Sequence, residues 1–197
     1  MKLKTILIIL GSIVALFFIA QIIYYYSVQS GIETYPYTLV KSYDDIEIRK
    51  YEASLFTSVK LNSSNYKKAS SEGFSVLAGY IFGDNKENKK IAMTSPVAMT
   101  LEDSTTMLFM VPRQFKKDDL PAPNKKDIEF KDMPAKTMAA ITFGGWANSE
   151  KIERYKSKLK AALEAKAIKH SNTFYFFGYN APFEMIHRKN EVVVELQ

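Results

Sequence analysis

The sequence predicts an α+β fold, a strongly curved antiparallel sheet or open barrel of eight or nine strands with two flanking helices, preceded by one transmembrane helix. Three observations support this prediction. Many short segments alternate apolar and polar residues, and two longer segments repeat apolar residues at helical spacing. The helical segments and two proline motifs recur in the same order, which predicts a βαβ unit used twice. Residues 5–26 contain no charged side chain.

Composition places the chain among globular proteins and excludes several kinds of site. Of its 197 residues 47% are hydrophobic, with 13 Phe and 12 Tyr, which is enough for one well-packed core. The net charge of +6 is modest and no dense basic run occurs, which argues against nucleic acid as a partner. The absence of cysteine excludes disulfides, thiolate metal sites and covalent attachment of haem.

The uncharged N-terminal segment predicts a membrane anchor. As a helix, residues 5–26 would be roughly 33 Å long, enough to cross a lipid bilayer. Lys2 and Lys4 precede the segment, so the positive-inside rule puts residues 1–4 in the cytoplasm and the C-terminal domain in the periplasm or cell exterior. Residues 27–34 then form a linker and residues 35–197 the folded domain. The alternative is a cleaved signal peptide, whose apolar region would be unusually long.

The first half of the domain predicts three strands and a helix. The strands cover residues 38–40, 46–51 and 55–61, where apolar residues alternate with polar ones or form a short run. Ser64 or Asn65 can cap a helix that runs to about residue 82. One face of this helix carries the apolar side chains of Phe74, Leu77, Ala78 and Ile81.

The second half predicts the same order of elements. Residues 97–102 and 106–111 form a hairpin, and residues 112–127 form a long polar connection without helical periodicity. Strands follow at 128–130 and 135–143, and a second helix begins after Asn148 or Ser149. The last predicted strands cover residues 174–177 and 191–196.

The two proline motifs carry the proposed repeat. The first covers residues 90–99 (KIAMTSPVAM) and the second covers residues 180–185 (NAPFEM). Pro96 corresponds to Pro182 at an offset of 86, while Leu77 corresponds to Leu159 at an offset of 82. We expect a ligand crevice between the two copies.

Spacing alone supports no catalytic or metal site. The two histidines, His170 and His187, are not at metal-ligand spacing, and no nucleophile elbow, phosphate loop or dinucleotide fingerprint is present. The remaining chemical signal is apolar, with Met93, Met99 and Met185 near the proline motifs. Such methionines belong either to the core or to an adaptable pocket for a flat hydrophobic ligand.

The motifs taken together resemble the SOUL haem-binding protein family. The similarity runs from residue 33 to the end of the chain. The matching segments are ETYPY (33–37), IEIRKY (46–51), YIFGDN (80–85), KIAMTSPV (90–97), PAP (121–123), FGGW (143–146), GYNAP (178–182) and RKNEV (188–192). The resemblance implies a distorted β-barrel with two helices and internal pseudo-twofold symmetry, similar to bacterial effector-binding domains of the gyrase-inhibitor type.

The resemblance also implies a function, namely non-covalent binding of haem or a related tetrapyrrole, without catalysis. The family's groove lies between the first helix and the second proline motif. On this sequence it maps to Phe74, Leu77, Ala78, Ile81, Phe183 and Met185, with Arg188 as the nearest cation for a propionate. No metal-ligating residue and no protein partner is identified.

Several family positions carry different residues here. Basic residues of vertebrate members fall at Ser71, Gly79 and Glu184, and a histidine proposed as iron ligand falls at Lys50. Two alternatives therefore stay open. One is an effector-binding module for other hydrophobic or cationic small molecules, or an interaction domain beside a membrane. The other is an enzyme that uses a groove carboxylate such as Glu184.

Overall fold

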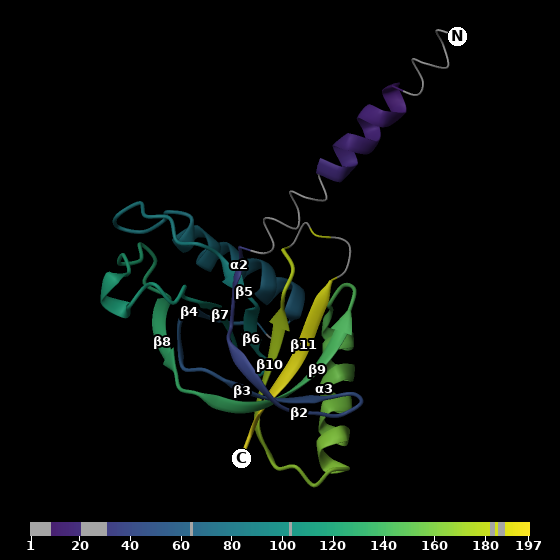
Figure 1. The fold of residues 1–197 in the computed structure, drawn as a ribbon. Helices are drawn as coiled ribbons and strands as arrows, with labels where there is room; N and C mark the ends of the chain where they lie inside the picture. The colour runs from purple at the N-terminus through teal and green to yellow at the C-terminus, as the bar shows by residue number, and fades with distance from the viewer. Residues whose placement is uncertain (1–8, 21–30, 64, 103, 182–183, 185–187) are drawn as a thin grey trace. The chain divides into compact units, whose positions relative to one another are not determined.

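A computed structural model describes residues 9–20, 31–63, 65–102, 104–181, 184 and 188–197. The chain divides into two compact units, residues 1–32 and residues 33–197. In the first unit, residues 9–20 form a helix with exposed apolar side chains, such as Leu16 and Phe17. The second unit holds all the strands of the described chain and two further helices (Figure 1).

The predicted membrane topology needs correction. At about 1.5 Å per residue, the helix over residues 9–20 is about 18 Å long, short of the roughly 30 Å hydrocarbon core of a bilayer. Among the described residues, no helix combines the length and hydropathy that a membrane crossing requires. The prediction of a single-pass protein with a cytoplasmic N-terminus and an extracytoplasmic domain is therefore wrong. The two ends of the predicted span, residues 5–8 and 21–26, lie outside the described residues.

The second unit contains the expected α+β mixture. Its strands are β1 (Glu33–Thr34), β2 (Tyr37–Ser42), β3 (Glu47–Tyr51), β4 (Ser54–Leu61), β5 (Thr94–Ser95), β6 (Val97–Thr100), β7 (Thr105–Met110), β8 (Ile128–Met133), β9 (Lys136–Gly144), β10 (His170–Gly178) and β11 (Lys189–Leu196). Its helices are α2 (Tyr66–Ile81), the 3-10 turn η1 (Lys117–Asp119) and α3 (Ser149–Glu164). The short parallel pair β1–β5 and the turn η1 were not predicted.

Nine strands form one curled antiparallel sheet in the order β2-β3-β9-β11-β10-β6-β7-β4-β8. Because β2 and β8 lie at opposite ends of this order, the sheet is an open half-barrel rather than a closed barrel (Figure 1). Without β2 the order is symmetric, since β3, β9, β11 and β10 occupy the places that β8, β4, β7 and β6 occupy in the other half. The strand order therefore agrees with a repeated unit.

The two helices support the same symmetry. Tyr66 corresponds to Ser149 and Ile81 to Glu164, so the helices have equal length at an offset of 83, one more than predicted. Each begins at an asparagine whose side chain accepts a backbone hydrogen bond, from Lys68 N to Asn65 (3.1 Å) and from Lys151 N to Asn148 (2.8 Å). These caps satisfy one of the free N–H groups at each helix start. The predicted helix starts are thus confirmed.

Strand alternation divides the buried side chains between the two faces of the sheet. One face packs against α2 and α3. Its core includes Leu77 of α2 and Leu159 of α3, together with Met107 and Val194 of the sheet. The other face lies inside the curl and has its own cluster, rich in Tyr, Phe and Met side chains. Its members are Tyr35, Tyr51, Phe56, Ala98, Leu108, Met110, Met133, Met138, Ala140, Tyr175, Phe177 and Val193. This inner face is filled by the protein's own side chains.

Tyr35 in this inner cluster leads to a stability prediction. Its hydroxyl is buried and has no hydrogen-bond partner among the described residues. We expect Tyr35→Phe to raise the free energy of unfolding by about 1 kcal/mol, because an unpaired buried hydroxyl is costly. Burial, with a contribution from Tyr175, also raises the pKa of Tyr35 to about 12.

The pH dependence gives the Tyr35 prediction a second readout. The raised pKa means that the contribution of Tyr35 to stability is constant below its ordinary pKa near 10 and is lost between pH 10 and pH 12. Urea unfolding at pH 8 and pH 11 measures both effects, and the Phe variant should lose less stability over this range than the wild type. A variant less stable than the wild type at pH 8 would show that the hydroxyl has a partner.

Candidate functional site

The first helix brings the predicted apolar residues to the sheet. Leu77, Ala78 and Ile81 are buried in the core beneath α2, while Phe74 is half-buried and its ring lies 5.5 Å from that of Phe109. Three of the four residues therefore contact the domain's own side chains. These three residues can support a ligand groove only from its core side. Phe74 is the only one of the four whose side chain is partly exposed.

Three residues of the second proline motif are described, namely Asn180, Ala181 and Glu184. Phe183 and Met185, the predicted partners of α2 across the groove, lie outside the described residues. Asn180 links the motif to the start of β11. Its side-chain oxygen accepts a hydrogen bond from Lys189 N (2.7 Å), and its amide donates to a carboxylate oxygen of Glu184 (2.6 Å).

Arg188 lies at the centre of the polar contacts of this motif. Its Nη1 donates to the carbonyl oxygens of Ala181 (3.1 Å) and Glu184. Its guanidinium carbon lies 4.1 Å from the ring centroid of Trp146, whose side chain is 55% exposed. Its Nε–H is buried without a hydrogen-bond partner among the described residues. Arg188 therefore has at least one N–H group that no described residue accepts.

Tyr66 connects the start of α2 to this arginine. Its ring packs edge-on against Phe176 at 5.2 Å. Burial raises the pKa of Tyr66, and the positive charge of Arg188 partly opposes that rise. Tyr66, in the first turn of α2, therefore lies within electrostatic range of Arg188.

The family positions that carry different residues are accessible to different degrees. Ser71 on α2 and Lys50 on β3 are exposed, whereas Gly79 is half-buried. A Cβ at Gly79 would meet only Asp84 atoms, at 3.8 and 3.9 Å. Ser71 can therefore be replaced by a larger side chain in solvent, and Gly79 has room for at least a Cβ atom.

A buried ion cluster lies at the border of the inner face. The guanidinium of Arg49 on β3 reaches across β9 to Glu191 on β11, with two hydrogen bonds of 2.8 and 2.9 Å. Glu191 is fully buried and also accepts hydrogen bonds from Tyr179 Oη (2.6 Å) and Thr142 Oγ1 (3.1 Å). Burial alone would raise the pKa of Glu191, but Arg49 outweighs it and holds the pKa below its ordinary value.

Sequence patterns alone do not predict this cluster. The alternation in residues 46–51 predicts that Glu47 and Arg49 face away from the apolar side of the strand, and a polar face is normally a solvent face. Here the sheet curls, so that face becomes an interior. The only signal was the tyrosine on the same face, Tyr51, whose hydroxyl accepts a hydrogen bond from Arg49 (3.1 Å).

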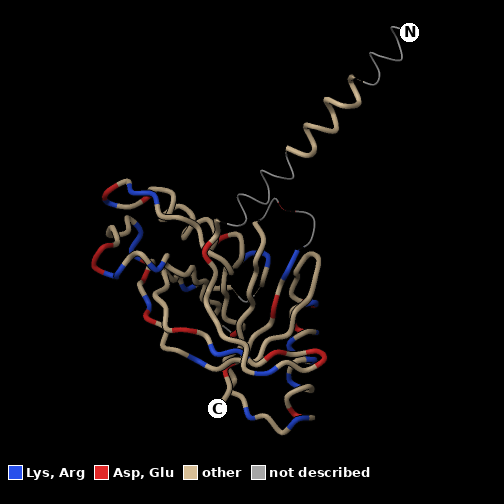
Figure 2. The backbone as a smooth tube through the Cα atoms, viewed as in Figure 1, with Lys and Arg blue, Asp and Glu red and all other residues tan. Residues whose placement is uncertain are grey.

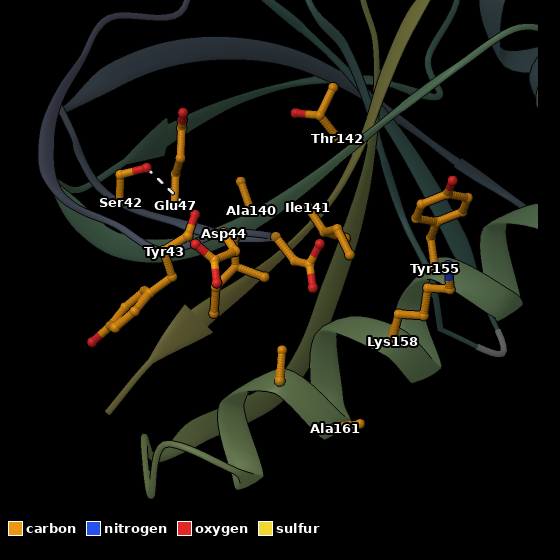
Figure 3. Close-up of a pocket in the computed structure, with 13 residues that line it drawn as sticks. Ser42, Tyr43, Asp44, Glu47, Ala140, Ile141, Thr142, Tyr155, Lys158 and Ala161 are labelled. Atoms are coloured by element: carbon orange, nitrogen blue, oxygen red, sulfur yellow. Dashed lines mark hydrogen bonds between the residues drawn. The ribbon is translucent and has the colours of Figure 1, made fainter.

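The structure also contains an open cavity of about 670 Å³ that the sequence did not predict. It lies between the turn that joins β2 to β3 and one side of α3 (Figure 3), and none of its lining residues belongs to α2. Its lining combines acidic, basic, aromatic and small apolar residues. They are Ser42, Tyr43, Asp44, Asp45, Ile46, Glu47, Ala140, Ile141, Thr142, Tyr155, Lys158, Ala161 and Ala162.

Solved structures of similar fold come from bacterial proteins. The C-terminal domain of EcmrR aligns with a TM-score of 0.61 and 11% identity, over 82% of this chain and 98% of that domain. A hydrolase from Listeria innocua aligns with a TM-score of 0.55 and 8% identity, over 80% of this chain and 94% of the other. At such identities the likeness shows a shared fold and carries no function.

The sequence relatives are more informative. Heme-binding protein 1 of Xenopus laevis is 30% identical over 154 residues, which cover 74% of this chain and 80% of that protein. Heme-binding protein 2 of Mus musculus is 29% identical over the same length, which covers 75% of the mouse protein. The sequence profile of the family described as SOUL heme-binding protein matches residues 32–195, nearly the whole second unit. The chain belongs to the SOUL heme-binding protein family.

Proposed function

We propose that the protein binds haem or a related tetrapyrrole non-covalently, and that it binds without catalysis. The observation that carries this proposal is the family match over residues 32–195, supported by relatives that are named heme-binding proteins. The proposed site is the groove between α2 and the second proline motif. Phe74 supplies apolar surface from the helix, and Phe183 and Met185 are the proposed residues on the opposite side.

The residues present fit an acidic, flat ligand at this site. A propionate carboxylate, the anionic group of haem, would accept a hydrogen bond from the Nε–H of Arg188, which has no partner among the described residues. The exposed indole of Trp146 holds the guanidinium plane in place by a cation–π contact. The bound group would supply the iron, and the chain's own residues supply apolar contact, orientation and one positive charge.

Hemin titration of the full-length protein tests the proposal. A saturable change in the Soret band at micromolar hemin is the expected result. We expect Arg188→Ala to weaken binding by about tenfold, the effect of losing one charge-assisted hydrogen bond. Arg188→Lys should restore part of the affinity, and Arg154→Ala on α3 is the matched control, since Arg154 contacts Tyr155 instead.

Introducing a basic residue at a position where family members carry one should strengthen hemin binding. Ser71→Arg adds a cation on the exposed side of α2, where family members carry a basic residue. We expect this variant to bind hemin severalfold more tightly than the wild type, because a second propionate gains a partner. A Soret band that shows no saturable change in either the wild type or the Ser71→Arg variant would overturn the proposal.

A second candidate is a module for hydrophobic cations. The acidic residue Glu184, at a position where family members are basic, favours it. Titration with a cationic amphiphile alongside hemin separates the two candidates. Tighter binding of the cation, with hemin unable to compete, would favour the second candidate.

A further inference from the structure

The cavity beside α3 has opposite charges on its two sides. The turn between β2 and β3 contributes Asp44 and Asp45, and α3 contributes Lys158 (Figure 3). Figure 2 shows the same pattern along the backbone, with acidic positions at the tip of this hairpin and basic positions along α3. Among the described residues, none of these three side chains forms an ion pair. The charges therefore face a shared space without neutralising each other.

The third acidic residue of the lining is already paired. Glu47 accepts a hydrogen bond from Arg49 Nε at 2.7 Å and forms an ion pair with that guanidinium. It therefore contributes little free negative charge to the cavity. The charged groups that remain available to a ligand are two carboxylates on one side of the cavity and one ammonium on the other.

The floor between these charges is small and apolar. Ala140 and Ile141 come from β9, and Ala161 and Ala162 come from α3. The ring of Tyr155 stands at one end, held by stacking on Phe143 with ring centroids 4.4 Å apart. A volume of about 670 Å³ lies within the range of roughly 300–1,000 Å³ that small-molecule sites occupy.

The equivalent position in the first copy is covered by a longer segment. At the helix offset of 83, the cavity residues Ala161 and Ala162 correspond to Ala78 and Gly79 on α2, next to Tyr80, which is buried and donates a hydrogen bond to the carbonyl of Pro121 at 2.9 Å. Leu120 is buried beside it, so the long connection before β8 packs onto α2. The corresponding segment before β3 is only a short turn. Because that turn is short, the space beside α3 is left open.

We propose that this cavity is a second ligand site, for a small amphipathic zwitterion of the amino-acid type. Its ammonium binds the carboxylates of Asp44 and Asp45, its acid group binds Lys158, and its side chain covers Ala161 and the edge of Tyr155. Each charged contact of this kind is a charge-assisted hydrogen bond, and both ends of the ligand must be present for each side of the cavity to gain an oppositely charged partner. The site is separate from the proposed haem groove and does not depend on haem binding.

Two-dimensional NMR of the full-length protein with three matched probes tests this site. L-tryptophan carries both charges, N-acetyl-L-tryptophan lacks the ammonium and L-tryptophanamide lacks the carboxylate. We expect saturable amide shifts in residues 43–47, 140–142 and 155–162 with millimolar L-tryptophan, and about tenfold weaker binding of each modified probe. Hemin should leave these shifts unchanged.

Variants assign the two ends of the ligand. Lys158→Met should remove the preference for L-tryptophan over its amide, and the double variant Asp44→Asn with Asp45→Asn should remove the preference over the N-acetyl compound. Lys160→Met and Asp118→Asn are the matched controls, because both lie outside the cavity lining. Ala161→Phe should block binding by filling the floor. Equal shifts with all three probes, shifts elsewhere on the protein, or none at all would each overturn the proposal.

Discussion

Replacing Glu191 by leucine should cost about 3 kcal/mol of the free energy of unfolding. The substitution leaves the guanidinium of Arg49 buried without its bidentate partner, and an uncompensated buried charge typically costs about 3–5 kcal/mol. We expect a cost at the lower end of this range because Arg49 keeps its hydrogen bonds to Glu47 and Tyr51. Urea unfolding followed by far-ultraviolet circular dichroism at pH 7 measures the loss.

Two further variants decide whether the buried pair causes this loss. Glu195→Leu, on the same strand, breaks a partly exposed ion pair with Lys136 (2.6 Å) and should cost less than about 1 kcal/mol. Combining Arg49→Met with Glu191→Leu should recover at least half of the single-variant loss, because no buried charge is left unpaired: Glu47 and Lys189, which lose their partners, are partly exposed. A double variant as unstable as Glu191→Leu alone would show that packing, and not charge, dominates at this position.

The same carboxylate gives a pH signature. Arg49 holds the folded-state pKa of Glu191 below the ordinary value of about 4.5. Its stabilising contribution is therefore present above that value and is lost as the pH falls through the lower folded-state pKa. The difference in stability between the wild type and Glu191→Leu should shrink on acidification from pH 7 to pH 3.

Local patterns were sufficient to predict most of the elements. Asn65 and Asn148 identify both helix starts, and alternation places β3, β4, β7 and β9, because caps and strand periodicity depend on neighbouring residues alone. Closure of the sheet depends on how far it curls over its whole width. The strand pattern therefore predicted a strongly curved sheet or an open barrel without deciding between them, and the resemblance implied a distorted barrel. The structure has a half-barrel that ends at β2 and β8.

Local patterns were likewise insufficient to predict the sites. Arg49 and Glu191 are separated by 142 positions, and only the order β3-β9-β11 brings them together. Asp44, Asp45 and Lys158 likewise line the same cavity only because α3 packs on the sheet. The proposed groove between α2 and the second proline motif was inferred from the family resemblance, because apolar spacing on a helix does not distinguish a core face from a ligand face. The burial of Leu77, Ala78 and Ile81 illustrates that ambiguity.

The two glycines of α2 should respond to substitution with opposite signs. A Cβ on Gly73 would lie 2.8 Å from Leu61 Cδ1 and 3.1 Å from Met107 Cβ, both in the core between α2 and the sheet. Gly73→Val should therefore destabilise the protein by about 2–3 kcal/mol through overpacking. Gly79→Ala meets no close atom and should stabilise it by about 0.5–1 kcal/mol, because alanine loses less backbone entropy in a helix.

Urea unfolding of both glycine variants provides the measurement, with hemin titration as a second readout. If Gly73 serves close packing of α2 on β4 and β7, the valine variant should unfold at lower urea concentration with an unchanged slope. The alanine variant at Gly79 should keep the hemin affinity of the wild type while unfolding at higher urea concentration. Equal stability of the two variants would mean that α2 lies farther from Leu61 and Met107 than these contacts require. In that case its buried apolar face would be free to move, and the groove beside the second proline motif would not be built on a fixed helix.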